Sequence, residues 1–137
     1  MVIVDTTVWV DYLRGTRNPE TEWLDQEVGR EEIGLTDLIL CEVLQGVRSE
    51  EEYRRVRMLL SEFELYEAGG AELCVAGAGN YRRLRDRGRA VRKTIDCLIA
   101  TFCIAQGHSL LHRDNEFRHF EELLGLAVIH PKRPSIS

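Results

Sequence analysis

No apolar run in this 137-residue chain approaches the roughly 20 residues that a membrane-spanning helix requires. The N-terminal Met-Val-Ile-Val-Asp also lacks the basic segment and apolar core of a secretory signal. Internal repeats, low-complexity tracts and linkers are absent as well, and the length suits a single domain, residues 1–137. We therefore expect a one-domain protein of the cytoplasm that does not enter a membrane.

Cysteine patterns typical of zinc sites are missing too. The four cysteines, Cys41, Cys74, Cys97 and Cys103, include no C-x-x-C pair. Each stands beside apolar residues in a segment that the pattern predicts to be helical. We therefore expect four reduced thiols in the hydrophobic core and no zinc site.

Lysine is scarce, with only Lys93 and Lys132, so nearly all of the positive charge is arginine. The 23 acidic and 18 basic residues give a net charge of −5, which disfavours a protein that binds nucleic acid non-specifically. Arginine is nevertheless the better bidentate ligand for phosphate. The acidic balance favours a protein partner that is itself basic.

What the sequence does contain is a regular alternation of short apolar segments and amphipathic ones. The apolar segments predict strands at Val2–Val4, Ile33–Thr36, Phe63–Tyr66, Ser109–His112 and Leu126–Ile129. The first amphipathic segment predicts a helix that Thr6 or Thr7 caps and that Gly15 ends. The others predict helices over Glu20–Val28, a stretch from its expected cap Asp37 to Val47, Glu50–Glu62, Ala68–Arg87, Ile95–Ala105 and Asn115–Leu124. This order is typical of an α/β domain with a parallel sheet. Residues 131–137 are expected to form a loose tail.

Four acids occupy unusual places in this pattern. Asp5 and Asp114 each follow a predicted strand, and ligands of open α/β sheets bind at the carboxyl ends of strands. Glu42 interrupts an apolar helical pattern, and Asp96 opens a helix that is otherwise nearly all apolar. Like charges brought together resist burial unless a cation neutralises them, and carboxylate oxygens suit Mg²⁺ or Mn²⁺. The pattern therefore indicates a metal-dependent enzyme that acts on phosphodiesters.

Each acid also has an ordinary structural interpretation. The three aspartates suit helix caps or first turns, and Glu42 suits a salt bridge to an arginine. One shared site explains all four at once, so we favour it. Accessory candidates are Thr6 and Thr7, which can orient Asp5 or cap a helix, and Glu116, near Asp114. The candidates for phosphate contacts are Arg14, Arg48, Arg92, Lys93 and Arg113.

The acids also lie in segments that resemble a known family. Val-Asp-Thr-Thr-Val-Trp-Val-Asp-Tyr-Leu-Arg-Gly, residues 4–15, is similar to the N-terminal motif of PIN-domain proteins, specifically VapC-like toxins. The resemblance continues through Cys-Glu-Val-Leu-Gln-Gly at 41–46, Thr-Ile-Asp-Cys-Leu-Ile-Ala at 94–100 and Leu-Leu-His-Arg-Asp-Asn-Glu-Phe at 110–117. It covers essentially the whole chain. Two positions depart from the pattern: His112, where threonine is common, and Glu116, where a further aspartate is common.

This resemblance implies a three-layer α/β/α domain with a central parallel sheet. It implies a ribonuclease that depends on Mg²⁺, or on Mn²⁺, with Asp5, Glu42, Asp96 and Asp114 as the acidic site that holds the metal. It further implies an RNA substrate, a cognate VapB-like antitoxin and a homodimer. A basic segment of the antitoxin placing an arginine among the carboxylates would also fit the acidic net charge.

Three alternatives have distinguishable signatures. A response-regulator receiver pairs acids near the first strand and places a lysine after a late strand, but Asp5 is followed by two threonines and no lysine appears there until Lys132. An aspartyl-nucleophile phosphatase shows Asp-x-Asp at the first strand, where this chain has Thr7. A non-catalytic PIN-like domain that binds RNA or protein is expected to have lost an acid, and all four are present.

Overall fold

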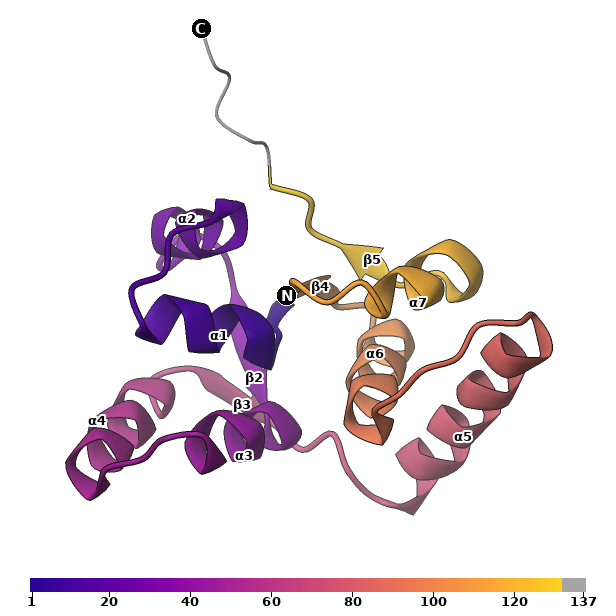
Figure 1. Ribbon diagram of the computed structural model, residues 1–137, viewed down its shortest axis with the longest axis horizontal. Coiled ribbons are helices and arrows are strands. Elements are labelled where there is room, and N and C mark those ends of the chain that lie inside the picture. The colour runs from indigo at the N-terminus through magenta and orange to yellow at the C-terminus, as the bar shows by residue number, and fades with distance from the viewer. Residues whose placement is uncertain (132–137) are drawn as a thin grey trace, which may run out of the picture.

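The computed structural model describes residues 1–131, which form one layered α/β unit (Figure 1). The strands are β1 (Val2–Val4), β2 (Ile33–Thr36), β3 (Glu64–Tyr66), β4 (Ser109–Leu111) and β5 (Ala127–Val128). The helices are α1 (Thr6–Leu13), α2 (Pro19–Glu27), α3 (Asp37–Gln45), α4 (Glu50–Leu60), α5 (Ala71–Asp86), α6 (Thr94–Gln106) and α7 (Phe117–Leu124). The first four helices lie on one side of the sheet and the last three on the other. The predicted α/β/α layering is confirmed.

The sheet has the order β3-β2-β1-β4-β5, and every pairing is parallel. The chain therefore builds outward from β1 in one direction and then, after α5 and α6, outward in the other. The order reverses between β1 and β4, which is the position where open α/β sheets form ligand sites. β3 is an edge strand, as its sequence predicts, with exposed Glu64 and Leu65.

Side-chain caps explain where several helices begin. The Asp5 carboxylate caps α1, the Asn18 amide oxygen accepts from the backbone of Thr21 at the start of α2, and Ser49 does the same for α4. α3 is capped by Thr36, whose hydroxyl accepts from the backbone N–H of Ile39 at 3.1 Å. Our prediction that Asp37 is this cap is therefore wrong by one residue.

Asp37 instead braces the segment that follows β3. Its Oδ1 atom accepts a hydrogen bond from the backbone N–H of Ala68 at 2.9 Å. The same oxygen accepts from the N–H of Leu38 at 2.9 Å. The side chain thus ties the first turn of α3 to a residue 31 positions away along the chain.

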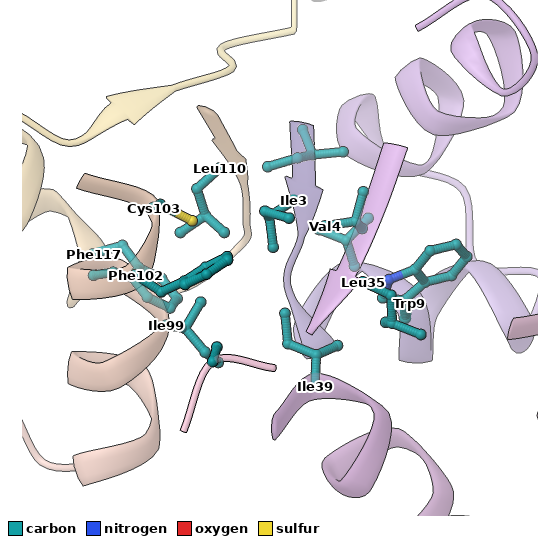
Figure 2. Close-up of a cluster of buried hydrophobic side chains, with 14 of the residues drawn as sticks. Ile3, Val4, Trp9, Leu35, Ile39, Ile99, Phe102, Cys103, Leu110 and Phe117 are labelled. Atoms are coloured by element: carbon teal, nitrogen blue, oxygen red, sulfur yellow. The ribbon is translucent and has the colours of Figure 1, made fainter. Parts of the chain in front are cut away.

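The hydrophobic core fills both faces of the sheet (Figure 2). Ile3, Val4 and Leu110 come from the central strands, and none is accessible to solvent. Trp9 packs edge-on against Phe63 on the side of α1, with ring centroids 5.1 Å apart. On the other side α6 contributes most of its length, which explains why its sequence is almost entirely apolar. No helix within residues 1–131 combines the length and hydrophobicity that crossing a bilayer requires.

The thiol prediction is correct for only half of the cysteines. Cys97 and Cys103 lie in the core on α6, but Cys41 and Cys74 are exposed. Cys41 lies two residues from both Ile39 and Val43, the buried positions of α3, and so points roughly 200° away from each. Element ends also shift by a few residues: α5 starts at Ala71 and α7 at Phe117. The tail predicted for 131–137 lies outside the described residues, apart from Pro131.

Candidate metal-dependent nuclease site

Asp5 lies at the carboxyl end of β1 and caps α1, so the helix start fixes its carboxylate. The Oδ2 atom accepts hydrogen bonds from the backbone N–H of Thr7 at 3.1 Å and from the Thr7 hydroxyl at 2.7 Å. The side chain is 2% exposed, and Oδ1 has no hydrogen-bond partner within residues 1–131. Burial raises the pKa of Asp5 to about 6, the Thr7 bonds oppose this rise, and Glu42 adds to it. One oxygen is thus held and the other is an unsatisfied acceptor.

Asp96 lies in the first turn of α6 and also has a carboxylate oxygen that is an unsatisfied acceptor. It is 5% exposed, and its Oδ2 atom has no partner in the described part of the chain. The pKa of Asp96 is raised to about 7, chiefly by burial and then by the neighbouring charges of Asp5 and Asp114. Lys93 opposes the rise and Glu42 adds to it. Three other predicted acids therefore lie near enough to act on the charge of Asp96.

Glu42 reaches this cluster from α3 on the other side of the sheet. Its Oε1 atom accepts a hydrogen bond from the Thr6 hydroxyl at 2.8 Å, and the side chain is half-buried. Thr6 and Thr7 are neighbours in the first turn of α1, yet they hold different carboxylates. The two threonines therefore have different roles: Thr7 orients Asp5, and Thr6 orients Glu42.

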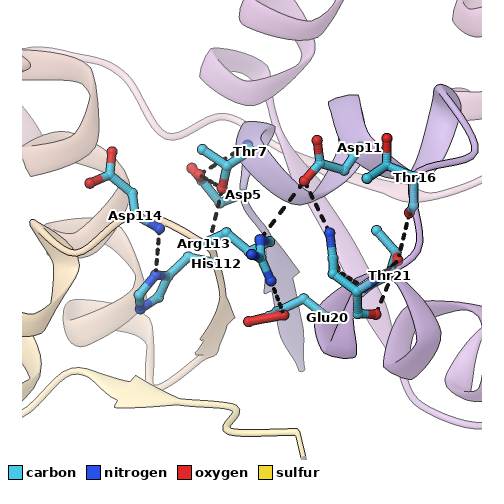
Figure 3. Close-up of polar contacts among 10 residues, drawn as sticks. Asp5, Thr7, Asp11, Thr16, Glu20, Thr21, His112, Arg113 and Asp114 are labelled. Atoms are coloured by element: carbon cyan, nitrogen blue, oxygen red, sulfur yellow. Dashed lines mark hydrogen bonds and ion pairs between the residues drawn. The ribbon is translucent and has the colours of Figure 1, made fainter. Parts of the chain in front are cut away.

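Asp114 follows β4 in a turn that a histidine stabilises (Figure 3). The backbone N–H of Asp114 donates to Nδ1 of His112 at 3.1 Å, and its Oδ1 atom accepts from the N–H of Glu116 at 3.0 Å. The His112 ring packs on Phe117, with centroids 4.9 Å apart, and burial lowers the pKa of this histidine. The ring is therefore neutral, with Nδ1 as the acceptor. The cap position of α7 belongs to Glu116 and not to Asp114.

Arg113 is engaged within the protein and does not reach freely toward a ligand (Figure 3). Its guanidinium donates to Glu20 of α2 at 2.7 Å and lies 3.9 Å from Asp11 of α1. Its backbone N–H donates to the Thr7 hydroxyl at 3.1 Å. Thr7 therefore accepts from the segment after β4 while donating to Asp5, which couples the ends of the two central strands.

The remaining basic candidates fall in two places. Arg92 and Lys93 line a cavity of about 530 Å³ together with Asp114 and Glu116. Glu116 also accepts a hydrogen bond from the backbone N–H of Arg92 at 3.1 Å, so it stabilises this rim. Arg14 and Arg48 instead line a different cavity of about 400 Å³, bounded by α1, α3 and α4. Arg92 and Lys93 thus line a cavity together with the site acid Asp114. Arg113 lines the same cavity, but its guanidinium is paired with Glu20 and Asp11.

The chemistry of the cluster suits a hard cation. Two buried carboxylate oxygens, on Asp5 and Asp96, lack hydrogen-bond partners among residues 1–131, and burying such atoms is costly unless something satisfies them. Oxygen donors of this kind match Mg²⁺ and Mn²⁺. Within residues 1–131, however, no three acidic, histidine or cysteine side chains already converge on a single cation position. The carboxylates are neighbours that repel one another, and they do not form a finished coordination sphere.

Sequence reasoning missed the residues that support the cluster. Asp11 and Glu20 hold Arg113, and His112 holds the backbone of Asp114. Asp11 had a usable signal, because it lies four residues after Thr7 and so on the same face of α1. Glu20 and Arg113 are 93 residues apart in sequence, and no local pattern links them.

Residues 2–123 match the family described as PIN domain. The chain belongs to that family. It is also 31% identical over 121 residues to VapC ribonuclease Mb1587 of Mycobacterium bovis and to ribonuclease VapC11 of Mycobacterium tuberculosis. Each alignment covers 85% of this chain and 89% of the relative, so within the PIN family the chain belongs with the VapC proteins.

Solved structures agree on the fold. VapBC2 from Rickettsia felis, bound to a DNA fragment from its promoter, has a chain that matches with a TM-score of 0.73 and 19% identity. The match covers 94% of this chain and 98% of that one. VapBC-1 from nontypeable Haemophilus influenzae matches with a TM-score of 0.72 and 17% identity, over 94% and 97% of the two chains. At these identities the likeness establishes the three-layer fold alone.

Proposed function

We propose that this protein is a metal-dependent endoribonuclease, the toxin of a VapBC-type pair, which hydrolyses RNA phosphodiester bonds at its carboxylate cluster. The observation that carries the proposal is a pair of buried carboxylates, Asp5 and Asp96, at the point where the strand order reverses. Each has one oxygen without a hydrogen-bond partner within residues 1–131. Mg²⁺ is the proposed cofactor, with Mn²⁺ as a substitute. The VapC relatives named as ribonucleases support RNA as the substrate.

Asp5, Asp96 and Asp114 are the proposed metal ligands, and Glu42 either ligates the metal or orients the attacking water. A divalent cation, when bound, supplies Lewis-acid chemistry that acidifies a water and stabilises charge on the phosphate. The protein's own contribution is orientation. Thr7 fixes one oxygen of Asp5 and leaves the other free, and Thr6 fixes one oxygen of Glu42. Such supporting bonds reduce the reorganisation that the reaction requires.

A VapB-like antitoxin is the proposed protein partner. The chains that match in the solved structures come from VapBC and other toxin–antitoxin complexes, and the net charge of −5 suits a basic partner. Homodimerisation stays a prediction, which light scattering of the purified protein would test. Location in the cytoplasm likewise stays a prediction.

The proposal is tested by incubating antitoxin-free protein with total cellular RNA in Mg²⁺, in Mn²⁺ and in EDTA. We expect discrete fragments with either metal and intact RNA in EDTA, because the cation supplies the Lewis acid that acidifies the water and stabilises charge on the phosphate. Fragments that persist in EDTA would contradict metal dependence. Intact RNA under all three conditions, from protein shown to be folded by circular dichroism, would contradict the nuclease and favour the non-catalytic domain.

Thr6 provides a finer test of the same site. Thr6→Val keeps the branched shape but removes the hydroxyl that donates to Glu42, so we expect divalent-cation affinity to fall on the order of tenfold. Thr6→Ser keeps the hydroxyl and should bind the cation as the wild type does. Isothermal titration with Mn²⁺ measures both, and unfolding curves check that stability is retained. Equal affinity in all three proteins would show that Thr6 does not support the site.

A further inference from the structure

Positive charge is concentrated in one short part of this acidic chain. Residues 82–93 hold seven of the 18 basic residues and one acidic residue, whereas the whole chain carries a net charge of −5. We call this stretch, Arg82 to Lys93, the arginine segment. It comprises the last turn of α5 and the loop that leads to α6.

Most of the charge in the arginine segment is available to a ligand. Arg82, Arg85, Arg87 and Lys93 are exposed, and none forms an ion pair within residues 1–131. Arg92 pairs with Glu116 at 3.6 Å, yet its side chain is still 90% exposed.

Helix α4 carries the same pattern of arginines, but there the positive charge is neutralised by nearby acids. Arg-Arg-Val-Arg at 54–57 on α4 repeats Arg-Arg-Leu-Arg at 82–85 on α5, and in both the apolar residue is buried. On α4, however, the first turn supplies Glu50, Glu51 and Glu52, and Arg55 lies 3.7 Å from Glu52. The charge of α4 is therefore balanced locally, and that of the arginine segment is not.

The arginine segment leads directly to the acidic site. Its last two residues, Arg92 and Lys93, line the cavity that also contains Asp114 and Glu116. Its first part is the last turn of α5, which packs on α6: the Cys97 thiol donates to the Gly77 carbonyl at 3.2 Å and the Asn80 amide donates to the Thr101 hydroxyl at 3.0 Å. Arg82 to Arg85 therefore lie beyond Thr101 along α6, and the loop after them connects this turn to the cavity. Figure 1 shows the loop after α5 returning to the start of α6.

We propose that the arginine segment binds the sugar–phosphate backbone of single-stranded RNA and delivers it to the carboxylates. This inference rests on the proposed nuclease function. Four repelling acids disfavour an approaching polyanion, so a compensating cationic surface next to them has a clear electrostatic purpose. Tyr81, 39% exposed, precedes the segment and lies one turn before Arg85, which adds an aromatic surface of the kind on which bases stack.

Two observations favour RNA over an acidic protein segment as the occupant. Six of the seven cations are arginine, whose planar guanidinium matches phosphate oxygens in a bidentate way. The segment also ends at the cavity that contains Asp114, where the proposed function requires a phosphodiester to be held.

The test measures RNA binding separately from cleavage. The Asp96→Asn protein in EDTA, which should not cut, is titrated against a fluorescent single-stranded RNA of roughly 16 nucleotides, using anisotropy. We expect Arg82→Gln/Arg83→Gln/Arg85→Gln to raise Kd at least tenfold. The slope of log K against log salt concentration should become shallower by about 2, because each of the three lost phosphate contacts contributes about 0.7 to it. The matched control, Arg54→Gln/Arg55→Gln/Arg57→Gln, makes the same charge change on α4 and should leave both unchanged. Arg87→Gln/Lys93→Gln removes two charges between α5 and α6 and should also weaken RNA binding. This variant serves as the test if the α5 triple variant fails to fold.

The outcomes separate this inference from the proposed function. Equal loss in the α5 and α4 variants, or no loss in either, would overturn the arginine segment as the RNA surface even if the wild type cleaves RNA. RNA binding that the α5 variant weakens and the α4 variant does not, by a protein whose wild type never cleaves RNA, would support the arginine segment as the RNA surface. It would contradict the proposed nuclease activity. Competition by polyglutamate as effective as that by unlabelled RNA would overturn RNA in favour of an acidic protein segment.

Discussion

Asp96→Asn should abolish RNA cleavage and at the same time make the metal-free protein more stable. Asparagine keeps the shape of the side chain but removes the charge that a metal ligand needs, so we expect activity to fall on the order of a thousandfold or more. The gain in stability follows from electrostatics. In the native protein Asp96 is buried, with a pKa raised to about 7 by burial and by the charges of Asp5 and Asp114. Removing the charge therefore relieves a cost on the order of a few kcal/mol at about pH 8.

Denaturant unfolding in EDTA measures the stability, and the RNA assay measures the activity. Asp25→Asn is the matched control, because Asp25 is an exposed aspartate on α2 whose charge lies outside the cluster. It should change neither quantity. Full activity in the Asp96→Asn protein would remove Asp96 from the site. A variant that is both inactive and less stable would show that Asp96 has a structural role that the charge argument does not include.

The metal-free protein should lose stability as the pH rises from about 4 to about 7. Asp5 and Asp96 have native pKa values of about 6 and about 7, above the ordinary value of 3.8, so the native state binds their protons more tightly than the unfolded chain does. Their contribution to the free energy of unfolding is fully present below the unfolded pKa of 3.8, and it is lost as the pH rises to the native pKa values of about 6 and about 7. We expect the free energy of unfolding in EDTA to drop by a few kcal/mol between about pH 5 and pH 8.

A divalent cation should reverse this loss. At about pH 8 it binds the ionised carboxylates of the native state, and a concentration of 100 Kd adds about 2.7 kcal/mol. At about pH 5 protons compete for the same oxygens, and the added stability should be small. Thermal unfolding across this pH range, with Mn²⁺ and with EDTA, measures both effects.

Other groups titrate in the same interval, and a variant separates them. Burial lowers the pKa of His112, so its contribution is lost as the pH falls, opposite in sign to that of the acids. The Asp5→Asn/Asp96→Asn protein keeps His112 and every other group, so its difference from the wild type isolates the two aspartates. If the two proteins show the same pH dependence, the pKa values of Asp5 and Asp96 are not raised as burial and the neighbouring charges predict.

The sequence drew attention to the four acids because each stood in a place with a local rule, and their role as a site stays a prediction. Asp5 and Asp114 follow strands, and the reversal of strand order between β1 and β4 brings those strand ends together. Asp96 was visible as a charge within an apolar helix. The thiol of Cys41 was mispredicted because apolar neighbours in sequence do not specify which face of α3 it occupies.

The supporting bonds were out of reach for a different reason. The contacts of Arg113 with Glu20, of Thr6 with Glu42 and of Asp37 with Ala68 each join separate elements. Their existence depends on how helices pack over the sheet, and no spacing along the chain records that. The exposure of the arginine segment was similarly invisible, since the sequence shows the charge but not the missing carboxylate partners.

The position of β1 in the middle of the sheet has a consequence for the order of synthesis. Residues 2–4 are made more than 100 residues before β4, the strand that completes their pairing, and Asp114 follows that strand. Asp5 and Asp96 can be brought together with Asp114 only after β4 has left the ribosome. A nascent chain therefore carries an incomplete cluster until that point, and the ribosome that makes this protein is not exposed to a finished site before then.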